Sequence, residues 1–205
     1  MLNRIRWHQH CLLCGTTPAP AQQPLCHGCH ADLPWSAQPV FLFQDMTVYS
    51  GFDYGWPINR LIHLFKYQAR LDLLPLLIQG FMTQPTPHID ALVAVPMSAQ
   101  RLRERGFNQA HILAKALGQQ WGIPVWQGVE RQRHTLRQQS LDRLDRLDNM
   151  QNAFVVQSSP PTRVMLIDDV FTTGSTLHAL AQKLTHAGTQ QLSASVIARV
   201  STTGR

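Results

Sequence analysis

Two adjacent carboxylates and a cluster of small hydroxyl residues stand close together near the carboxyl end of the chain. An apolar run over 164–167 leads into Asp168 and Asp169, and a helical pattern begins shortly afterwards. Between them lies a loop made of Thr172, Thr173, Gly174, Ser175 and Thr176. Backbone N–H groups in such a turn and at a helix start bind phosphate. Carboxylates suit the hydroxyl groups of a sugar instead, so the motif predicts a sugar-phosphate site.

Two other interpretations of this motif are weaker. A strand that ends in acids also occurs where carboxylates serve Mg²⁺ in nucleotide hydrolases, but that site needs a GxxxxGK[ST] loop, and the chain has no Gly-Lys pair. A GxGxxG dinucleotide motif is also missing. An ordinary strand, turn and helix cap would explain Ser175 or Thr176 as the cap, but it would not explain two consecutive acids.

A second chemical pattern is the pair of CxxC motifs formed by Cys11, Cys14, Cys26 and Cys29, with eleven residues between the two motifs. Two such turns complete a tetrahedral Zn²⁺ site, which is closed and therefore structural. The segment has too little apolar sequence to fold alone, so metal would supply stability. Disulfides or unrelated thiols are the alternatives. We interpret the nearby histidines as solvated groups: His8, His10, His27 and His30.

Composition sets broad limits on function. Apolar residues make up 44% and charged residues 15% of the 205-residue chain, which argues against disorder and against a coiled coil. The net charge of +6 suits an anionic ligand such as a phosphate, a nucleotide or a nucleic acid. No segment approaches the roughly 18 apolar residues that span a bilayer. We therefore expect no membrane insertion and a cytoplasmic location, where cysteines stay reduced.

The character of the sequence changes near Pro39, which predicts a zinc-binding module over 1–38 and an α/β domain over 39–205. In the second part, extended and helical patterns alternate. We predict strands over 47–54, 91–95, 154–156, 164–167 and 192–200, and helices near 58–65, 108–121 and 177–184. This order points to a largely parallel sheet, whose ligands bind at the carboxyl ends of the strands.

Two further segments carry polar residues that suit a phosphate ligand. Arg101 and Arg105 follow the predicted strand over 91–95, and their planar guanidinium groups bind phosphate oxygens in pairs. A solvated basic helix face is the alternative, and it is strongest for Arg103. The segment 131–149 is rich in Arg, Gln and Asp and fits neither a helix nor a strand well. We predict that it is a mobile lid.

The stretch 164–176 resembles the motif that binds phosphoribosyl pyrophosphate (PRPP) in type I phosphoribosyltransferases. The resemblance implies a type I phosphoribosyltransferase-like α/β fold, with a mainly parallel sheet flanked by helices and, here, the small N-terminal zinc module. It also implies that Asp168 and Asp169 hold the ribose 2′- and 3′-hydroxyl groups and that residues 172–176 bind the 5′-phosphate. Arg101 and Arg105 then lie where pyrophosphate is expected.

Several separate motifs resemble the ComF/GntX family, the competence-associated branch of this fold. They are the Arg-x3-Arg-Gly-Phe-Asn-Gln pattern over 101–109, the Lys-aromatic element over 64–67, the pattern over 131–154 and the leading cysteines. The resemblance therefore extends over about 11–200. It implies a link to natural transformation and DNA use, with single-stranded DNA or a competence-machinery protein as a partner.

For an enzyme of this kind, we expect Mg²⁺-dependent displacement at ribose C1 with release of pyrophosphate, catalysed mainly by positioning and charge neutralisation. The expected catalytic residues are Asp168 and Asp169, together with Thr135 and Gln138 as lid contacts. Two alternatives remain. One is a non-catalytic PRPP-sensing adaptor, and the other is a zinc-containing protein that binds nucleic acid. The acceptor cannot be inferred from these residues.

Overall fold

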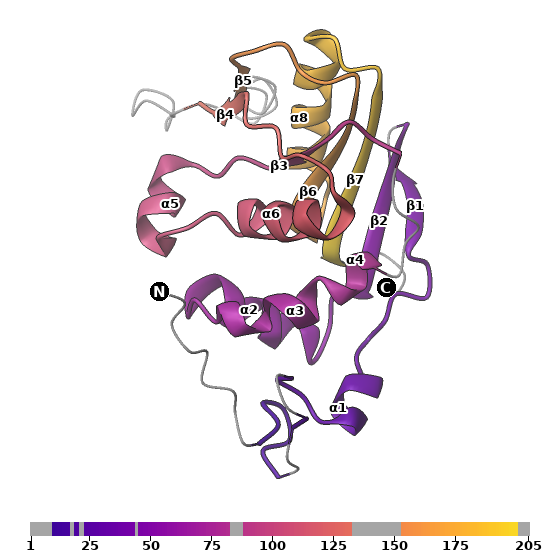
Figure 1. The fold of residues 1–205 in the computed structure, drawn as a ribbon, viewed down its shortest axis with the longest axis vertical. Helices are drawn as coiled ribbons and strands as arrows, with labels where there is room; N and C mark the ends of the chain where they lie inside the picture. Colours follow the sequence, from indigo (N-terminus) through magenta and orange to yellow (C-terminus); the bar gives the residue numbers. More distant parts are fainter. Residues whose placement is uncertain are drawn as a thin grey trace.

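A five-stranded sheet forms the centre of the protein in this computed structural model, which describes residues 10–16, 19–20, 23–43, 45–82, 88–132 and 153–200. The strand order is β1-β2-β7-β6-β3, and only the edge pair β1–β2 is antiparallel (Figure 1). The strands are β1 (Val40–Phe43), β2 (Met46–Asp53), β3 (Ala91–Ala94), β6 (Arg163–Phe171) and β7 (Gln191–Arg199). The predicted, mostly parallel sheet is therefore confirmed.

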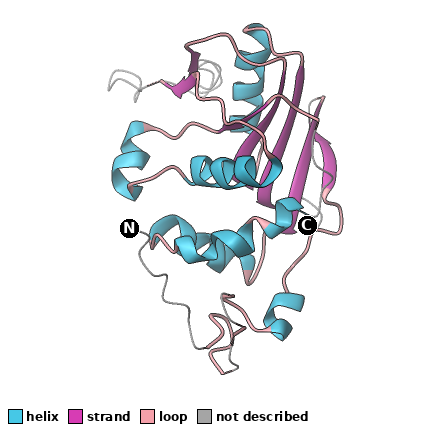
Figure 2. Cartoon of the chain, viewed as in Figure 1, coloured by secondary structure: helices cyan, strands magenta, loops and turns pink. Residues whose placement is uncertain are grey.

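Helices cover both faces of the sheet (Figure 2). The helices of the described residues are α1 (His27–Ala31), α2 (Ile58–Tyr67), η1 (Leu71–Leu73), α3 (Leu74–Leu77), α4 (Gln79–Met82), α5 (Ala99–Arg105), α6 (Gln109–Trp121) and α8 (Ser175–His186). Alternate residues of β6 point to opposite faces, as the pleat of a strand requires. Met165 and Ile167 pack with α2, α3 and α6, whereas Val164 and Leu166 pack with α8. Burial on both faces explains why β6 is a continuous apolar run.

A separate antiparallel pair consists of β4 (Val129–Arg131) and β5 (Phe154–Val156). It packs against the α8 side of the sheet through Val129 and Phe154, both of which are buried. Most of the predicted lid lies outside the described residues, and so do Thr135 and Gln138. Their expected contacts remain predictions.

The cysteine-containing segment packs directly on the α/β domain. Leu25 and Leu33 belong to the same buried cluster as Phe52 of β2. Trp35 lies 4.5 Å from Phe52 between ring centroids, and His30 Nε2 is 2.7 Å from Gln79 Oε1. The segment thus uses part of the main core, and the predicted boundary at residue 38 stays a prediction. Within the described part of the chain, no helix is long and apolar enough to cross a bilayer.

Candidate functional site

The acidic pair lies at the carboxyl end of β6, where the neighbouring strand has already ended. β3 stops at Ala94, opposite Ile167, and the Val95 N–H donates to the Ile167 carbonyl at 3.0 Å. β6 itself continues to Phe171 along β7, so the two acids lie inside the strand and not just after it, as the sequence had suggested. Because β3 is shorter, one flank of the acidic pair is open to a cavity.

The loop after β6 depends on Gly174. Its φ of +73° lies in the left-handed region, and a Cβ there would lie 2.5 Å from the Phe43 ring. Glycine is therefore required both by the backbone and by the space available. Gly174 is the N-cap of α8, so the interpretation of Ser175 or Thr176 as an ordinary cap is wrong. The hydroxyl oxygens of Thr173 and Ser175 lie 2.9 Å apart beside the helix start.

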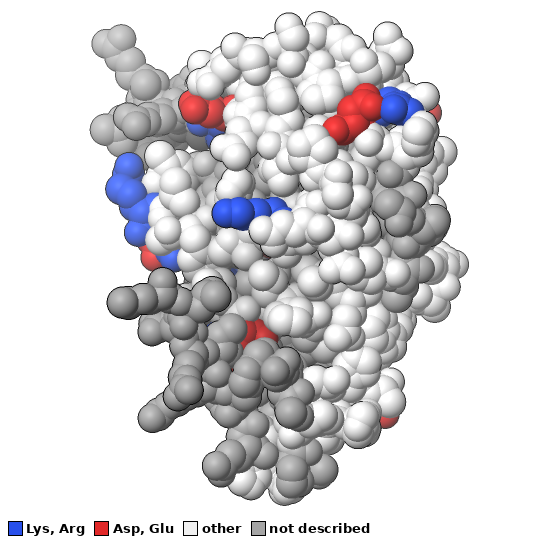
Figure 3. Space-filling view, viewed as in Figure 1, with Lys and Arg blue, Asp and Glu red and all other residues white. Residues whose placement is uncertain are grey.

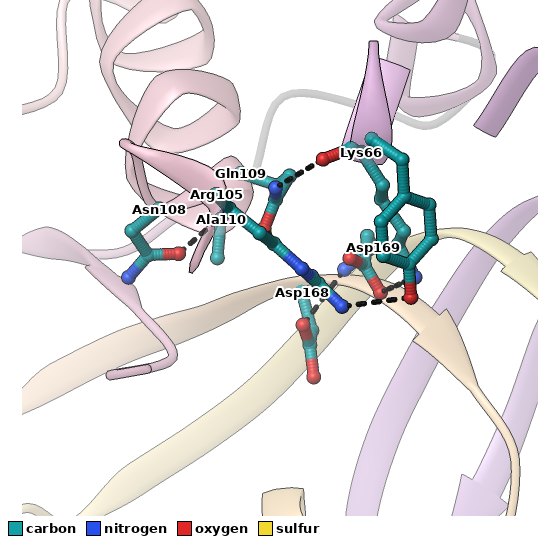
Figure 4. Close-up of polar contacts among 8 residues, drawn as sticks. Lys66, Arg105, Asn108, Gln109, Ala110, Asp168 and Asp169 are labelled. Atoms are coloured by element: carbon teal, nitrogen blue, oxygen red, sulfur yellow. Dashed lines mark hydrogen bonds and ion pairs between the residues drawn. The ribbon is translucent and has the colours of Figure 1, made fainter. Parts of the chain in front are cut away.

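Lys66 comes from the carboxyl end of α2 and reaches the acidic pair. Its Nζ is 2.8 Å from Asp169 Oδ1, and the two side chains are only 17% and 15% exposed. Figure 4 shows this contact beside Asp168. Partial burial strengthens an ion pair relative to one in open solvent. Asp169 thus has its counter-ion within the chain.

A partly buried hydrogen-bond network holds Lys66 in position. Gln109, which is 1% exposed, donates from Nε2 to the Lys66 carbonyl at 3.3 Å. Arg105 Nη1 donates to Gln109 Oε1 at 3.1 Å, and Arg105 Nη2 donates to the Tyr67 hydroxyl at 3.0 Å (Figure 4). Asn108 caps α6 by accepting from the Ala110 N–H at 3.0 Å. These contacts fix α2 against α5 and α6.

Asp168 has an unusual acidity. Burial, followed by repulsion from Asp169, raises the pKa of Asp168 from 3.8 to about 7. The Asp169 N–H donates to Asp168 Oδ1 at 2.8 Å and favours the charged form, as do Lys66 and Arg131. The carboxyl group therefore changes its charge near neutral pH.

Arg131, on β4, lies near Asp168 and is also partly buried. Burial and the positive charge of Arg101 lower the pKa of Arg131, while Asp168 opposes that change. Its guanidinium carbon lies 5.4 Å from the centre of the Phe154 ring. Arg101 and Arg131 thus bring two positive charges close together, which favours an anion beside them.

A cavity of about 180 Å³ unites these groups. Five predicted site residues line it: Asp168, Asp169, Thr176, Arg101 and Arg105. The other loop residues, Thr172, Thr173, Gly174 and Ser175, are not among those that line the cavity and connect β6 to α8 beside it. Sequence reasoning did not assign Lys66, Gln109 or Arg131 to the site, although Lys66 stood in a recognised Lys-aromatic element and Arg131 began the predicted lid. Gln109 gave no signal beyond its place in the arginine pattern.

The four cysteines form a second candidate site. One ligand atom from each lies within 4.8 Å of all the others, and none of the cysteines is in a disulfide. Burial tends to raise the pKa of Cys11, but N–H groups of Cys14, Cys26 and Leu13 stabilise its thiolate, and the net pKa is lowered. Burial and the neighbouring thiols raise the pKa of Cys29 to about 12. The cluster can hold a metal ion.

Comparison with known proteins identifies the family. The chain is 33% identical over 195 residues to Competence protein F of Haemophilus influenzae, covering 86% of this chain and 85% of that protein. The chain belongs to the ComF family. It is also 35% identical over 147 residues to DNA utilization protein YhgH of Escherichia coli, covering 66% of this chain and 64% of that protein. Competence protein ComFC of Bacillus subtilis is 28% identical over 193 residues, covering 91% and 75%. No family model matches the chain.

Two solved structures resemble this chain in part. One is described as the allosteric regulatory enzyme of purine biosynthesis, with 18% identity, a TM-score of 0.42, and coverage of 64% of this chain and 26% of that one. Another is a purine phosphoribosyltransferase from Pyrococcus horikoshii, with 14% identity, a TM-score of 0.34, and coverage of 74% and 87%. The sheet topology and the cysteine cluster of the ComF protein match the predicted architecture: a mostly parallel sheet flanked by helices, and a compact cluster of four cysteines.

Proposed function

We propose that this ComF protein binds PRPP at the carboxyl end of β6 and transfers its phosphoribosyl group. The cavity shared by two carboxylates and four basic side chains supports this proposal most strongly. Asp168 and Asp169 would accept hydrogen bonds from the ribose hydroxyl groups. The loop over 172–176 would bind the 5′-phosphate at the start of α8. Arg101 and Arg105 would hold pyrophosphate with their guanidinium groups.

The reaction would be a displacement at ribose C1. A nucleophilic acceptor forms a bond to C1, the bond from C1 to the pyrophosphate oxygen breaks, and pyrophosphate leaves with the electron pair. Positive charge develops on the sugar ring, and the neighbouring carboxylates tolerate it. Arginine side chains neutralise the charge of the leaving group. Catalysis then depends on positioning and on fixed charges.

Mg²⁺ fits this arrangement as a cofactor, because carboxylate and phosphate oxygens are its preferred ligands. It would be held beside Asp168 and Asp169 together with oxygen atoms of PRPP. When bound, Mg²⁺ supplies charge neutralisation for the pyrophosphate group. Lys66 already neutralises Asp169 in part, so PRPP and its metal would have to share or displace that ion pair.

Zinc fits the four-cysteine cluster. Four thiolates at short mutual separation suit a tetrahedral Zn²⁺ site, and four protein ligands leave no open position for catalysis. The metal would therefore be structural. It would fix the segment around Leu25 and Leu33 against the core of the α/β domain.

Calorimetric titration of Mg²⁺ and PRPP tests the proposed function. We expect PRPP to bind the wild-type protein and not the double variant Asp168→Asn with Asp169→Asn, because the variant loses both ribose acceptors. Asp32→Asn is the matched control, since Asp32 is exposed and lies at the end of α1. Normal PRPP binding by the double variant would show that the ribose assignment is wrong. If the wild-type protein binds PRPP, an assay of pyrophosphate release with candidate acceptors distinguishes an enzyme from a PRPP-sensing adaptor.

A second candidate function is the binding of single-stranded DNA or of a competence-machinery protein, in the cytoplasm. The names of the relatives and the basic side chains gathered over α5 favour it (Figure 3). Arg101 and Arg103 are exposed there. DNA affinity that falls steeply with salt and is reduced by Arg103→Met would support this function, because released counter-ions set the salt slope.

A further inference from the structure

A second and larger cavity adjoins the proposed PRPP site. It has a volume of about 820 Å³ and lies between α5, α6 and the β4–β5 pair. Four residues line both cavities: Pro96, Met97, Asn108 and Arg131. The two spaces are therefore neighbours with a common wall. We call the larger one the β4–β5 cavity. Its volume falls within the range of sites that bind small organic molecules.

The walls of the β4–β5 cavity are largely apolar and include aromatic rings. Leu102 on α5 is 44% exposed and Val155 on β5 is 43% exposed, and both side chains line the cavity. Phe107 and Trp126 line it as well. Two large apolar side chains left in solvent on the walls of a concave site indicate that something apolar covers them. Aromatic rings favour a flat aromatic partner through stacking.

Polar side chains line the β4–β5 cavity as well, among them the carboxylate of Glu130 and, at the end shared with the smaller cavity, Arg131. Arg131 lines both cavities, and its Nε is a buried donor that has no hydrogen-bond partner among the described residues. A buried donor without an acceptor is costly, so a ligand that supplies an acceptor is favoured there. Arg101 adds a second positive charge close to Arg131. An anionic group is therefore the best complement to this end of the cavity.

We propose that the β4–β5 cavity binds a flat heteroaromatic acid, with its acid group at Arg131 and its ring against the apolar walls. This inference goes beyond the proposed function and does not depend on it, because the site needs neither PRPP nor Asp168 and Asp169. A compound bound there would lie next to a ligand of the smaller cavity. If PRPP also binds, the two sites together would bring an acid of this class close to the phosphoribosyl group.

Orotate and pyridine-2,3-dicarboxylate are the probes for this site, with uracil and nicotinamide as their neutral counterparts. We expect the acids to bind the wild-type protein at least about tenfold more tightly than the neutral compounds, since a charge-assisted contact to arginine is strong. Binding is measured by calorimetry and by saturation-transfer NMR, without PRPP. The inference is overturned if neither acid binds, or if the neutral compounds bind equally well.

Three variants locate the site. Leu102→Trp fills the cavity from an exposed position, so the affinity for the acids and for the neutral compounds should fall by about tenfold. Arg131→Met should remove the preference for acids, whereas Arg131→Lys should keep part of it. Arg103→Met is the matched control, because Arg103 is exposed on α5 and lines neither cavity. Unchanged acid binding in Leu102→Trp would place the probes elsewhere and overturn the inference.

PRPP binding by the same variants separates this inference from the proposed function. Leu102→Trp should leave PRPP affinity unchanged, since Leu102 does not line the smaller cavity. Acid binding without PRPP binding would support the β4–β5 cavity and contradict the proposed function. PRPP binding without acid binding would support the proposed function and contradict the inference about the β4–β5 cavity. Unfolding curves of each variant show whether a loss comes from misfolding, and Leu102→Trp is the decisive variant if Arg131→Met does not fold.

Discussion

The acidic pair and the cysteine cluster each bring together groups that can become negatively charged, but different groups balance that charge at the two sites. At the end of β6, Lys66 lies 2.8 Å from Asp169, so the chain itself supplies a counter-ion. Around Cys11, the described groups that stabilise the thiolate are backbone N–H groups, and Cys29 has its pKa raised to about 12. The chain itself thus balances part of the charge of the acidic pair, whereas the four thiols need a cation to be ionised together.

The largest expected effect comes from breaking the cysteine cluster. Cys11→Ser should lower the zinc content and loosen the N-terminal segment. Because Cys11 is buried with Leu25 and Leu33 in the main core, we expect a loss of about 3–5 kcal/mol in the free energy of unfolding. Zinc analysis and thermal unfolding measure the effect.

His27→Ala is the control for the cysteine variant, since His27 is exposed beside Cys26. Full zinc stoichiometry and an unchanged proteolysis pattern in Cys11→Ser would argue against a site built from four thiolates. Treatment of the wild-type protein with a strong chelator should reproduce the variant's behaviour. If the chelator-treated protein unfolds at the same temperature as the untreated protein, the cysteine cluster does not need a cation, and it does not differ from the acidic pair in this respect.

A smaller effect is expected from removing the chain's own counter-ion. Lys66→Met leaves Asp169 partly buried without its ammonium partner and should cost about 2 kcal/mol in the free energy of unfolding. Adding Asp169→Asn should recover most of that loss, which a double-mutant cycle measures. Lys66→Arg should be mild, and Lys115→Met on the exposed face of α6 should be neutral. Equal losses in the single and double variants would show that the pair is not coupled.

The last expected effect is a pH dependence of stability at Asp168. An unfolded chain releases this proton near pH 4, whereas the folded protein keeps it until about pH 7. The folded state therefore binds more protons between these values, and stability falls as pH rises through that window. Asp168→Asn should be more stable than wild type by up to about 4 kcal/mol at pH 8, at about 1.4 kcal/mol per pKa unit, and equal to it at pH 4.

Urea unfolding at a series of pH values tests the Asp168 prediction. A difference between variant and wild type that stays constant from pH 4 to pH 8 would show that Asp168 titrates normally. Asp32→Asn serves again as the exposed carboxyl control. An ordinary pKa for Asp168 would also mean that Lys66 and Arg131 fully neutralise the carboxylate pair, and the acidic pair would then no longer resemble the thiols in its unbalanced charge.

Local patterns predicted much of the fold. The apolar run over 164–167 predicted β6, and apolar residues at helical spacing predicted α2, α6 and α8. Several elements were missed, among them β1 and α5. β1 (Val40–Phe43) is a short edge strand with partly exposed residues, so it lacks a clear apolar signal. α5 (Ala99–Arg105) buries none of its residues, and its charged sequence gave no apolar stripe.

The sequence by itself determined the chemistry of the two sites, because adjacent acids, a Gly-centred hydroxyl loop and paired CxxC motifs are local arrangements that need only a strand, a turn or a short helix. Only the tertiary structure decided which distant groups join them. Lys66, at the end of α2, pairs with Asp169 of β6, and Arg131 of the separate β4–β5 pair lines the same cavity as Asp168. Side-chain period and residue type say nothing about such long-range contacts. The β4–β5 cavity likewise exists only where α5 and α6 lie opposite a strand pair that follows them in the chain.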